Sequence, residues 1–419
     1  MLPKNLFSMC KCLHCTGTER RILFAAASIA CAFLFMACSL FHTAPVMPAY
    51  GNVTTGAERT QEYLPLLQNK RVGIVANHTS IIGETHLVDS LISLGVNVKR
   101  IFTPEHGFRG TADAGERVNT AVDERTGLPL ISLYGSERKP SPEYLKDLDI
   151  MIYDIQDVGV RYYTYIGTMH YVMEACAENG VPLLILDRPN PNGFYVDGPL
   201  LDMEYRSFVG MHPVTIVHGM TVAEYATMIN GEGWLEGGIK TDLHYVLCED
   251  YDHLTLYRLP VNPSPNLQTQ LSIYLYPSIC LFEGTIVSLG RGTNLPFMVF
   301  GHPQMANTDF QFTPRSVPGA TNPPLLGETA NGVDLSGIPE SYFIERRALN
   351  LEWLLFAYNN TPRELEFFNG FFNRLAGYGH LRKWIESGKT AEEISATWVK
   401  DVEDFKKVRR KYLLYDDFE

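Results

Sequence analysis

The chain has 419 residues, of which 45% are apolar and 20% are charged. This length and composition are typical of a globular protein of two or three domains, and they exclude a mostly disordered or collagen-like chain. The net charge is −12. Proteins that bind nucleic acid without sequence preference gather positive charge to neutralise phosphates, so we expect no nucleic-acid partner.

The first 37 residues have the pattern of a secretory signal. Basic residues precede the apolar run 22–34, as in the n-region and h-region of a signal peptide. The run ends at Ala37-Cys38, which is typical of bacterial lipoproteins, in which the cysteine is lipidated and becomes the mature N-terminus. A simply cleaved signal or an uncleaved anchor remains an alternative, because the apolar stretch to Phe41 is just long enough to span a bilayer. We therefore predict an exported lipoprotein, periplasmic or on the outer membrane, held to the membrane through a lipid on Cys38.

Cysteine usage is consistent with removal of this segment. Five of the eight cysteines lie within the first 38 residues, and only Cys176, Cys248 and Cys280 remain in the body of the chain. A set that is sparse and odd in number does not form a disulfide framework. The cysteine cluster over 10–15 precedes the predicted cleavage site, so we predict no metal site there.

The next part of the chain alternates apolar runs with segments of helical spacing. We read residues 38–58, which are rich in Pro, Gly, Thr and Ala, as a tether. The predicted strands are Arg71–Asn77, Val96–Phe102, Leu130–Tyr134, Asp149–Ile155 and Val181–Leu186, and the predicted helices between them are Thr85–Leu94, Glu143–Asp147 and Tyr165–Glu178. Nearly continuous apolar strands separated by helices indicate a doubly wound parallel sheet that is covered on both faces. We assign residues 59–205 to this α/β domain.

The pattern changes after about residue 205. A helix is predicted over Met220–Asn230, and glycines and proline-rich turns follow it. Two further helices are predicted near the end of the chain, Glu340–Asn359 and Ala391–Lys411, of which the second has one apolar face. We assign residues 206–419 to a second domain of mixed α+β structure.

Polar residues follow the predicted strands, at the edge where open parallel sheets bind their ligands. The acidic and histidine side chains at this edge are Glu105, His106, Asp154, Asp157 and Asp187. Glu105 and His106 could supply acid or base chemistry, or they could only brace a loop. Asp154 and Asp157 suit an acid–base role or the cap of the helix that follows. Asp187, which precedes an arginine and a proline, could pin its loop.

Two other features suit a sugar or an anion. Tyr163 belongs to a group of three tyrosines that could stack on a sugar ring or pack in the core. Arg291 lies between two glycines and could face an anionic group or sit in a turn. The sequence lacks a Walker A loop, a GxSxG elbow, an HExxH helix and a GxGxxG turn after the first strand. We therefore predict no cofactor and no metal.

Several longer strings resemble one family. They are PEHGFRG (104–110), DIQDVGVRYYTYIGTM (154–169), LDRPNPNG (186–193), FVGMHPVTIVHGMTVAEYA (208–226) and YPSICLFEGTIVSLGRGT (276–293). In these strings the chain resembles the exo-β-N-acetylmuramidases of the NamZ type, glycoside hydrolase family 171. The likeness extends over nearly all of the chain from about residue 60.

This resemblance implies a Rossmann-like catalytic domain, a C-terminal auxiliary domain and an active site in the cleft between them. It also implies an exo-acting hydrolase, without a nucleotide cofactor, that releases N-acetylmuramic acid (MurNAc) from the non-reducing end of peptidoglycan fragments such as MurNAc-GlcNAc, in cell-wall turnover and recycling. The catalytic glutamate of the family falls on Glu105, with His106 beside it. Two alternatives stay open: a periplasmic sugar-binding lipoprotein without turnover, and a metal-dependent hydrolase using Asp154, Asp157 and His106, which the lack of ligand spacing disfavours.

The implied substrate adds a requirement for positive charge. MurNAc differs from N-acetylglucosamine by a lactyl ether with a carboxylate, which an arginine can hold through two parallel hydrogen bonds. We rank Arg161 first as this cation, Arg291 second and Arg109 third, and each could instead belong to an internal ion pair. We further expect Asp154 or Asp157 to orient the 2-acetamido group if that group acts as the internal nucleophile.

Overall fold

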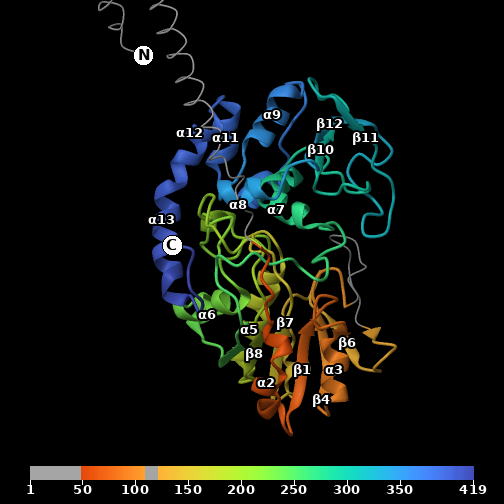
Figure 1. Ribbon diagram of the computed structural model, residues 1–419, viewed down its shortest axis with the longest axis vertical. Helices are drawn as coiled ribbons and strands as arrows, with labels where there is room; N and C mark the ends of the chain where they lie inside the picture. The colour runs from red at the N-terminus through yellow and green to blue at the C-terminus, as the bar shows by residue number, and fades with distance from the viewer. Residues whose placement is uncertain (1–48, 109–120) are drawn as a thin grey trace, which may run out of the picture. The chain divides into compact units, whose positions relative to one another are not determined.

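A seven-stranded sheet forms the N-terminal part of the protein in the computed structural model, which describes residues 49–108 and 121–419 (Figure 1). The strands lie in the order β5-β6-β4-β1-β7-β8-β9. Their bounds are β1 Arg71–Ala76, β4 Asn97–Thr103, β5 Ala121–Val122, β6 Pro129–Ser132, β7 Ile150–Asp154, β8 Leu183–Leu186 and β9 Leu243–Val246. All neighbours pair in parallel except β5 and β6, which are antiparallel. The predicted α/β class and its parallel sheet are confirmed.

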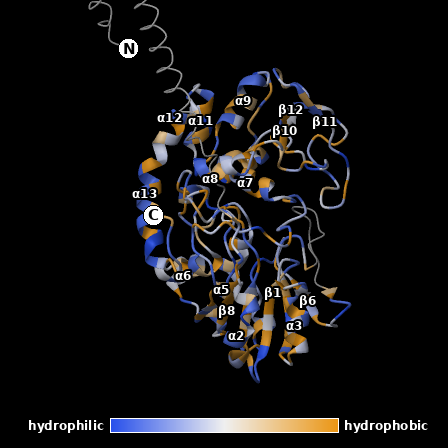
Figure 2. Ribbon diagram, viewed as in Figure 1, coloured by the Kyte–Doolittle hydropathy of each residue, from blue (hydrophilic) through white to orange (hydrophobic). Residues whose placement is uncertain are grey.

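The central strands β7 and β8 are almost entirely apolar because both of their faces are buried. In β7, Ile150 and Ile152 join one hydrophobic core, whereas Met151 and Tyr153 join the other. This alternation follows from the two-residue repeat of a strand, and apolar residues are concentrated on the strands in Figure 2. The helices and the small hairpin of this part are α2 Thr60–Leu67, β2 Ile81–Ile82, β3 Thr85–His86, α3 Leu87–Ser93, α4 Pro142–Leu145, α5 Tyr165–Asn179 and α6 Val222–Glu232.

Local sequence signals explain where the two longest of these helices start or stop. Thr221 and Glu224 form a reciprocal capping box at the start of α6. Gly180 ends α5 in the left-handed region, with φ +64°, which glycine adopts without steric cost.

Two sequence predictions about the ends of the first domain are wrong. Strand β9 extends the sheet well past residue 205, and it was missed because it is short and only its last residue is buried. The tether predicted over 38–58 ends earlier, since residues from Tyr50 onward already contact the body. The amide of Gly51 donates to the carbonyl of Leu256, and the amide of Thr54 donates to that of Glu249.

The C-terminal part combines helices with a three-stranded antiparallel sheet in the order β10-β12-β11. Its elements are α7 Gln270–Ile279, β10 Val299–His302, β11 Phe310–Phe312, β12 Ala330–Asp334, α8 Ser341–Arg346, α9 Glu352–Asn360, α10 Phe372–Ala376, α11 His380–Glu386, α12 Ala391–Ser395 and α13 Val399–Arg409. This confirms the predicted mixed α+β structure.

Both long helices predicted near the end of the chain are interrupted. The segment predicted as one helix over 340–359 is α8 and α9, because Arg347 ends α8 in the left-handed region at φ +48°. The segment predicted over 391–411 is divided by a 3₁₀ turn, Ala396–Trp398, between α12 and α13. No helix among the residues described is long and apolar enough to cross a membrane.

The end of the chain returns to the N-terminal part, where α13 leads toward α6 (Figure 1). The guanidinium of Arg409 donates two hydrogen bonds to the carbonyl oxygen of Gly219, at 2.7 and 3.0 Å. The hydroxyl of Tyr415 donates to the Asp187 carboxylate at 2.7 Å. The last residues of the chain therefore contribute polar partners to the interior of the sheet domain.

Candidate active site

A cavity of about 810 Å³ lies beyond the carboxyl ends of the central strands. Loops that follow β4, β6 and β7 contribute Glu105, Tyr134 and Tyr163 to it, and the C-terminal part contributes Glu283 and Arg291. Its volume is in the usual range for sites that bind small molecules. The predicted position of a site, at the strand ends and between the two parts of the chain, agrees with this cavity.

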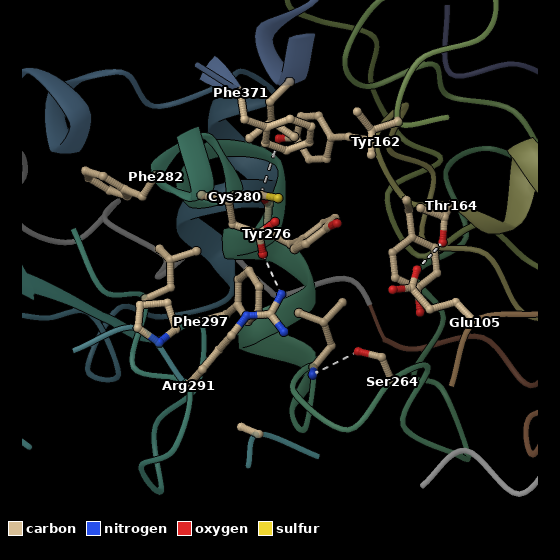
Figure 3. A pocket seen from close by; sticks show the side chains of 18 of the residues that line it. Glu105, Tyr162, Thr164, Ser264, Tyr276, Cys280, Phe282, Arg291, Phe297 and Phe371 are labelled. Carbon is tan, nitrogen blue, oxygen red and sulfur yellow. Dashed lines mark hydrogen bonds and ion pairs between the residues drawn. The ribbon is translucent and has the colours of Figure 1, made fainter. Parts of the chain in front are cut away.

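Glu105 lies on one wall, where two hydroxyl groups hold its carboxylate. The hydroxyl of Thr164 donates to Oε2 at 2.7 Å, and Figure 3 shows these two side chains facing each other. The Tyr134 hydroxyl is also hydrogen-bonded to the Glu105 carboxylate. Burial, followed by the negative charge of Glu105, raises the pKa of Tyr134 above its usual value, so this phenol stays protonated and donates. The carboxylate thus has a fixed orientation in the cavity.

The loop that carries Glu105 has an unusual backbone. His106 is buried and has φ +68°, which is uncommon for a residue with a side chain. Gly107 also has a positive φ, and its amide donates to the carbonyl of Pro104 at 3.1 Å, which closes a tight turn. Non-glycine residues in this region cost free energy, and such strain persists only where the surrounding structure enforces it. The turn places Glu105 and His106 together at the cavity.

Aromatic side chains form much of the neighbouring wall. The rings of Tyr163 and Tyr165 pack edge to face with centroids 4.8 Å apart, and Tyr163 makes a similar contact with Tyr276 at 5.8 Å. The Tyr163 hydroxyl donates to the carbonyl of Pro263 at 2.8 Å. Tyr163 therefore lines the cavity, where its ring is mostly covered by other rings, and its stacking on a sugar stays a prediction.

Arg291 lines the opposite wall, near Phe297 in Figure 3. Its guanidinium pairs with the carboxylate of Glu283 and stacks on the Phe297 ring, with the guanidinium carbon 4.9 Å from the ring centroid. Of the described residues that line the cavity, Glu105 and Glu283 are the two that carry carboxylates. The site therefore presents one carboxylate held by hydroxyls and another held by a cation.

Comparison with known proteins assigns this arrangement to a family. Residues 72–271 match the model for the N-terminal domain of exo-beta-N-acetylmuramidase NamZ, and residues 274–415 match the model for its C-terminal domain. The chain belongs to the NamZ family. The sequence is 40% identical to the peptidoglycan beta-N-acetylmuramidase NamZ of Bacillus subtilis (strain 168), over 84% of this chain and 89% of that protein.

Solved structures from Bacteroides fragilis NCTC 9343 also resemble this NamZ family member. One DUF1343 family protein superposes with a TM-score of 0.82 and 52% identity, covering 87% of this chain and 99% of its own. A second has a TM-score of 0.70 and 30% identity, covering 88% of this chain and 100% of its own. The likeness therefore extends over both parts of the fold.

The aspartates predicted as catalytic in this NamZ family member lie outside the cavity. Asp154 is fully buried, and the Arg188 guanidinium donates to both of its oxygens at 2.5 and 2.9 Å. Asp157 accepts from the amide of Gly159 at 2.6 Å, and burial raises its pKa to about 7. Neither residue lines the cavity. Their predicted catalytic roles are therefore wrong, because each carboxylate is turned into the protein interior.

The structure also contradicts the predicted substrate-binding role of Asp187 and the metal-site hypothesis. Asp187 is buried away from the cavity, where it accepts hydrogen bonds from the Tyr415 hydroxyl and the Ala223 amide. Burial raises the pKa of Asp187 to about 6. Among residues 49–108 and 121–419, no group of three or more His, Cys, Asp or Glu side chains is placed to hold a metal ion. Asp154, Asp157 and His106 thus do not come together as a ligand set.

Arg161, ranked first as the cation for the substrate carboxylate, is a structural residue. Its guanidinium donates to the carbonyl oxygens of Pro199 and Val214, both at 2.9 Å, and to that of Ala376 at 2.5 Å. The side chain is buried and does not line the cavity. That prediction is wrong. Arg291 does line the cavity but is paired with Glu283, and Arg109 lies outside the described residues.

Sequence reasoning missed other residues that line the cavity. They are Tyr134, Arg138, Phe208, Glu283 and Arg374. Tyr134 and Arg138 follow β6, so the strand-end argument that found Glu105 could also have found them. Phe208, Glu283 and Arg374 come from loops and short helices without such a signal.

Proposed function

We propose that this protein is an exo-acting glycoside hydrolase that releases MurNAc from the non-reducing ends of peptidoglycan fragments, in cell-wall turnover and recycling. Its place in the NamZ family supports this activity, as does its similarity to the peptidoglycan beta-N-acetylmuramidase NamZ of Bacillus subtilis. The observation that carries the proposal is Glu105, whose carboxylate is held by two hydroxyl groups at the wall of the cavity.

The geometry suits general acid catalysis by Glu105. Glycosidases use a carboxylic acid to protonate the glycosidic oxygen while positive charge develops on the sugar ring. Thr164 and Tyr134 fix the direction of the Glu105 carboxyl group, which reduces the reorganisation needed when the proton moves. The proton thus passes from Glu105 to the leaving oxygen as the bond to MurNAc breaks.

Glu283 replaces Asp154 and Asp157 as the second carboxylate in this proposal. It lines the same cavity, and its ion pair with Arg291 fixes the position of its carboxylate there. Glu283 would either activate the attacking water or orient the 2-acetamido group of the sugar. Analysis of the anomer released first distinguishes inversion from retention.

Incubation with the disaccharide MurNAc-GlcNAc tests the activity directly. We expect equal amounts of free MurNAc and N-acetylglucosamine, identified by mass spectrometry. The alternative, a sugar-binding protein without turnover, predicts that the disaccharide binds, as measured by calorimetry, and is recovered intact. Recovery of intact disaccharide under conditions where it is shown to bind would therefore overturn the proposed activity.

We further propose that the protein is exported and anchored through Cys38. The basic residues, the apolar run and the Ala37-Cys38 junction support this location. A single acyl chain binds a membrane only marginally, whereas several chains on one cysteine anchor firmly. Metabolic labelling with a fatty-acid probe should mark the wild type and not Cys38→Ser. An unlabelled wild type, or labelled Cys38→Ser protein, would contradict the anchor.

A further inference from the structure

Three arginines line the cavity within the part of the chain that the structure describes, and their surroundings differ. Arg291 is paired with Glu283. Arg374 is exposed on the short helix α10. Arg138 is half-buried, and its guanidinium carbon lies 4.2 Å from the centroid of the Phe208 ring. Arg138 is therefore the one of the three that is held in place by an aromatic ring and not by a carboxylate.

Arg138 has no hydrogen bond or ion pair with a described residue. Its Nε is buried without a hydrogen-bond partner. The next residue provides a contrast, because the ammonium of Lys139 pairs with Glu174 at 2.8 Å and with Glu178 at 2.6 Å. A partly desolvated guanidinium without a counter-ion costs free energy, which an anionic ligand would offset. The Arg138 guanidinium is thus available to bind an anion in the cavity.

The position of Arg138 relative to the catalytic acid determines which sugar it could contact. Arg138 and Tyr134 lie against the same ring: the guanidinium carbon of Arg138 is 4.2 Å from the centroid of Phe208, and the Tyr134 centroid is 6.2 Å from it. Tyr134 is itself hydrogen-bonded to Glu105. Arg138 therefore lies on the same side of the cavity as the acid. In an exo-acting enzyme, the terminal sugar occupies the site beside the acid, so its substituents are the groups within reach.

We propose that Arg138 binds the lactyl carboxylate of the terminal MurNAc and so determines the preference for MurNAc over N-acetylglucosamine. This inference rests on the proposed function. The guanidinium can form two parallel hydrogen bonds to a carboxylate, and stacking on Phe208 fixes the plane of that fork. N-acetylglucosamine lacks the carboxylate and would leave the cation unpaired.

Three chromogenic β-glycosides test the proposal: those of MurNAc, of its lactyl methyl ester and of N-acetylglucosamine. For the wild type we expect the ester to react about 10- to 100-fold less efficiently than the acid, since charge-assisted hydrogen bonds are lost. In R138Q, kcat/KM for the acid should fall by a similar factor, mainly through KM, while the ester and N-acetylglucosamine values change little. The preference of the enzyme for the free acid should therefore disappear.

R363Q is a matched control, because Arg363 also stacks on an aromatic ring, with its guanidinium carbon 4.0 Å from the centroid of Tyr358, but lies away from the cavity. It should keep the wild-type preference. R138K keeps the charge without the fork, so an intermediate preference is expected, and this variant also serves if R138Q does not fold. The role of Arg138 would be overturned if R138Q and R138K both kept the full preference for the acid. It would also be overturned if R374Q, and not the two Arg138 variants, abolished that preference. A wild type inactive on all three glycosides would instead refute the proposed function, and the role of Arg138 with it.

Discussion

Replacing Arg161 with methionine tests whether this residue stabilises the fold or binds substrate. Methionine keeps an unbranched apolar side chain and removes the guanidinium. Three carbonyl groups, those of Pro199, Val214 and Ala376, would then lose a charged donor. Each buried polar group left unpaired costs about 1 to 3 kcal/mol.

Part of this loss is offset, because the buried charge is itself unfavourable: burial lowers the pKa of Arg161 to about 10. We therefore expect R161M to lower the free energy of unfolding by about 3 to 5 kcal/mol. The entropy of unfolding grows with chain length, so this corresponds to a decrease in Tm of about 4 to 7 °C for a chain of this size. Thermal unfolding followed by circular dichroism measures the shift.

The same variant has a kinetic readout. Because Arg161 does not line the cavity, R161M assayed well below its Tm should keep the wild-type preference for the MurNAc glycoside over the N-acetylglucosamine glycoside. Gly377→Ala is a useful companion, since the added Cβ would lie 2.5 Å from Nη2 of Arg161 at a position with φ +67°, and it should also lower Tm. An R161M protein with unchanged Tm and lost preference would refute this reasoning and restore Arg161 as a substrate ligand.

Four other variants extend the tests. Glu105→Gln should lower kcat by about 10²- to 10⁴-fold, because the amide cannot protonate the leaving oxygen; near-wild-type turnover would exclude Glu105 as the acid. Glu283→Gln should also lower kcat, and unchanged turnover would exclude Glu283 as the second carboxylate. Gly231→Ala should lower Tm, since its Cβ would lie 2.1 Å from the Tyr412 ring, and a stable variant would contradict that close packing. Burial raises the pKa of Asp157 in the folded state to about 7, so folding favours the protonated acid. As pH rises from about 4 to 7, the stability of the wild type should therefore decline relative to that of Asp157→Asn. A Tm difference between the two proteins that does not widen in favour of the variant between pH 5 and 8 would contradict this.

The sheet could be predicted from the sequence because its signal is local. A strand such as β7, buried on both faces, is a short run of apolar residues whatever surrounds it. The break at Arg347 could not be predicted, since a left-handed arginine carries no sequence signal. Likewise β9 is short and mostly uncovered, so it lacks the apolar run that revealed the other strands.

The candidate site was only partly predictable for a related reason. Glu105 was found because it follows a strand and belongs to a family motif. Arg161 and Asp154 also follow or end a strand, but their partners, Ala376 and Arg188, are 215 and 34 residues away along the chain. Whether a side chain at a strand end faces a cavity or the interior depends on such distant partners.

The return of the chain's end to the sheet domain has a consequence for how the protein is made. The carboxylate of Asp187 and the hydroxyl of Tyr415 that hydrogen-bonds to it are 228 residues apart. A nascent chain therefore carries this carboxylate without its partner until the final residues emerge, and the first half of the protein cannot complete its interior during synthesis. Removing the last few residues should thus destabilise the sheet domain around Asp187. An incomplete chain would have neither a finished sheet domain nor a second wall for its cavity.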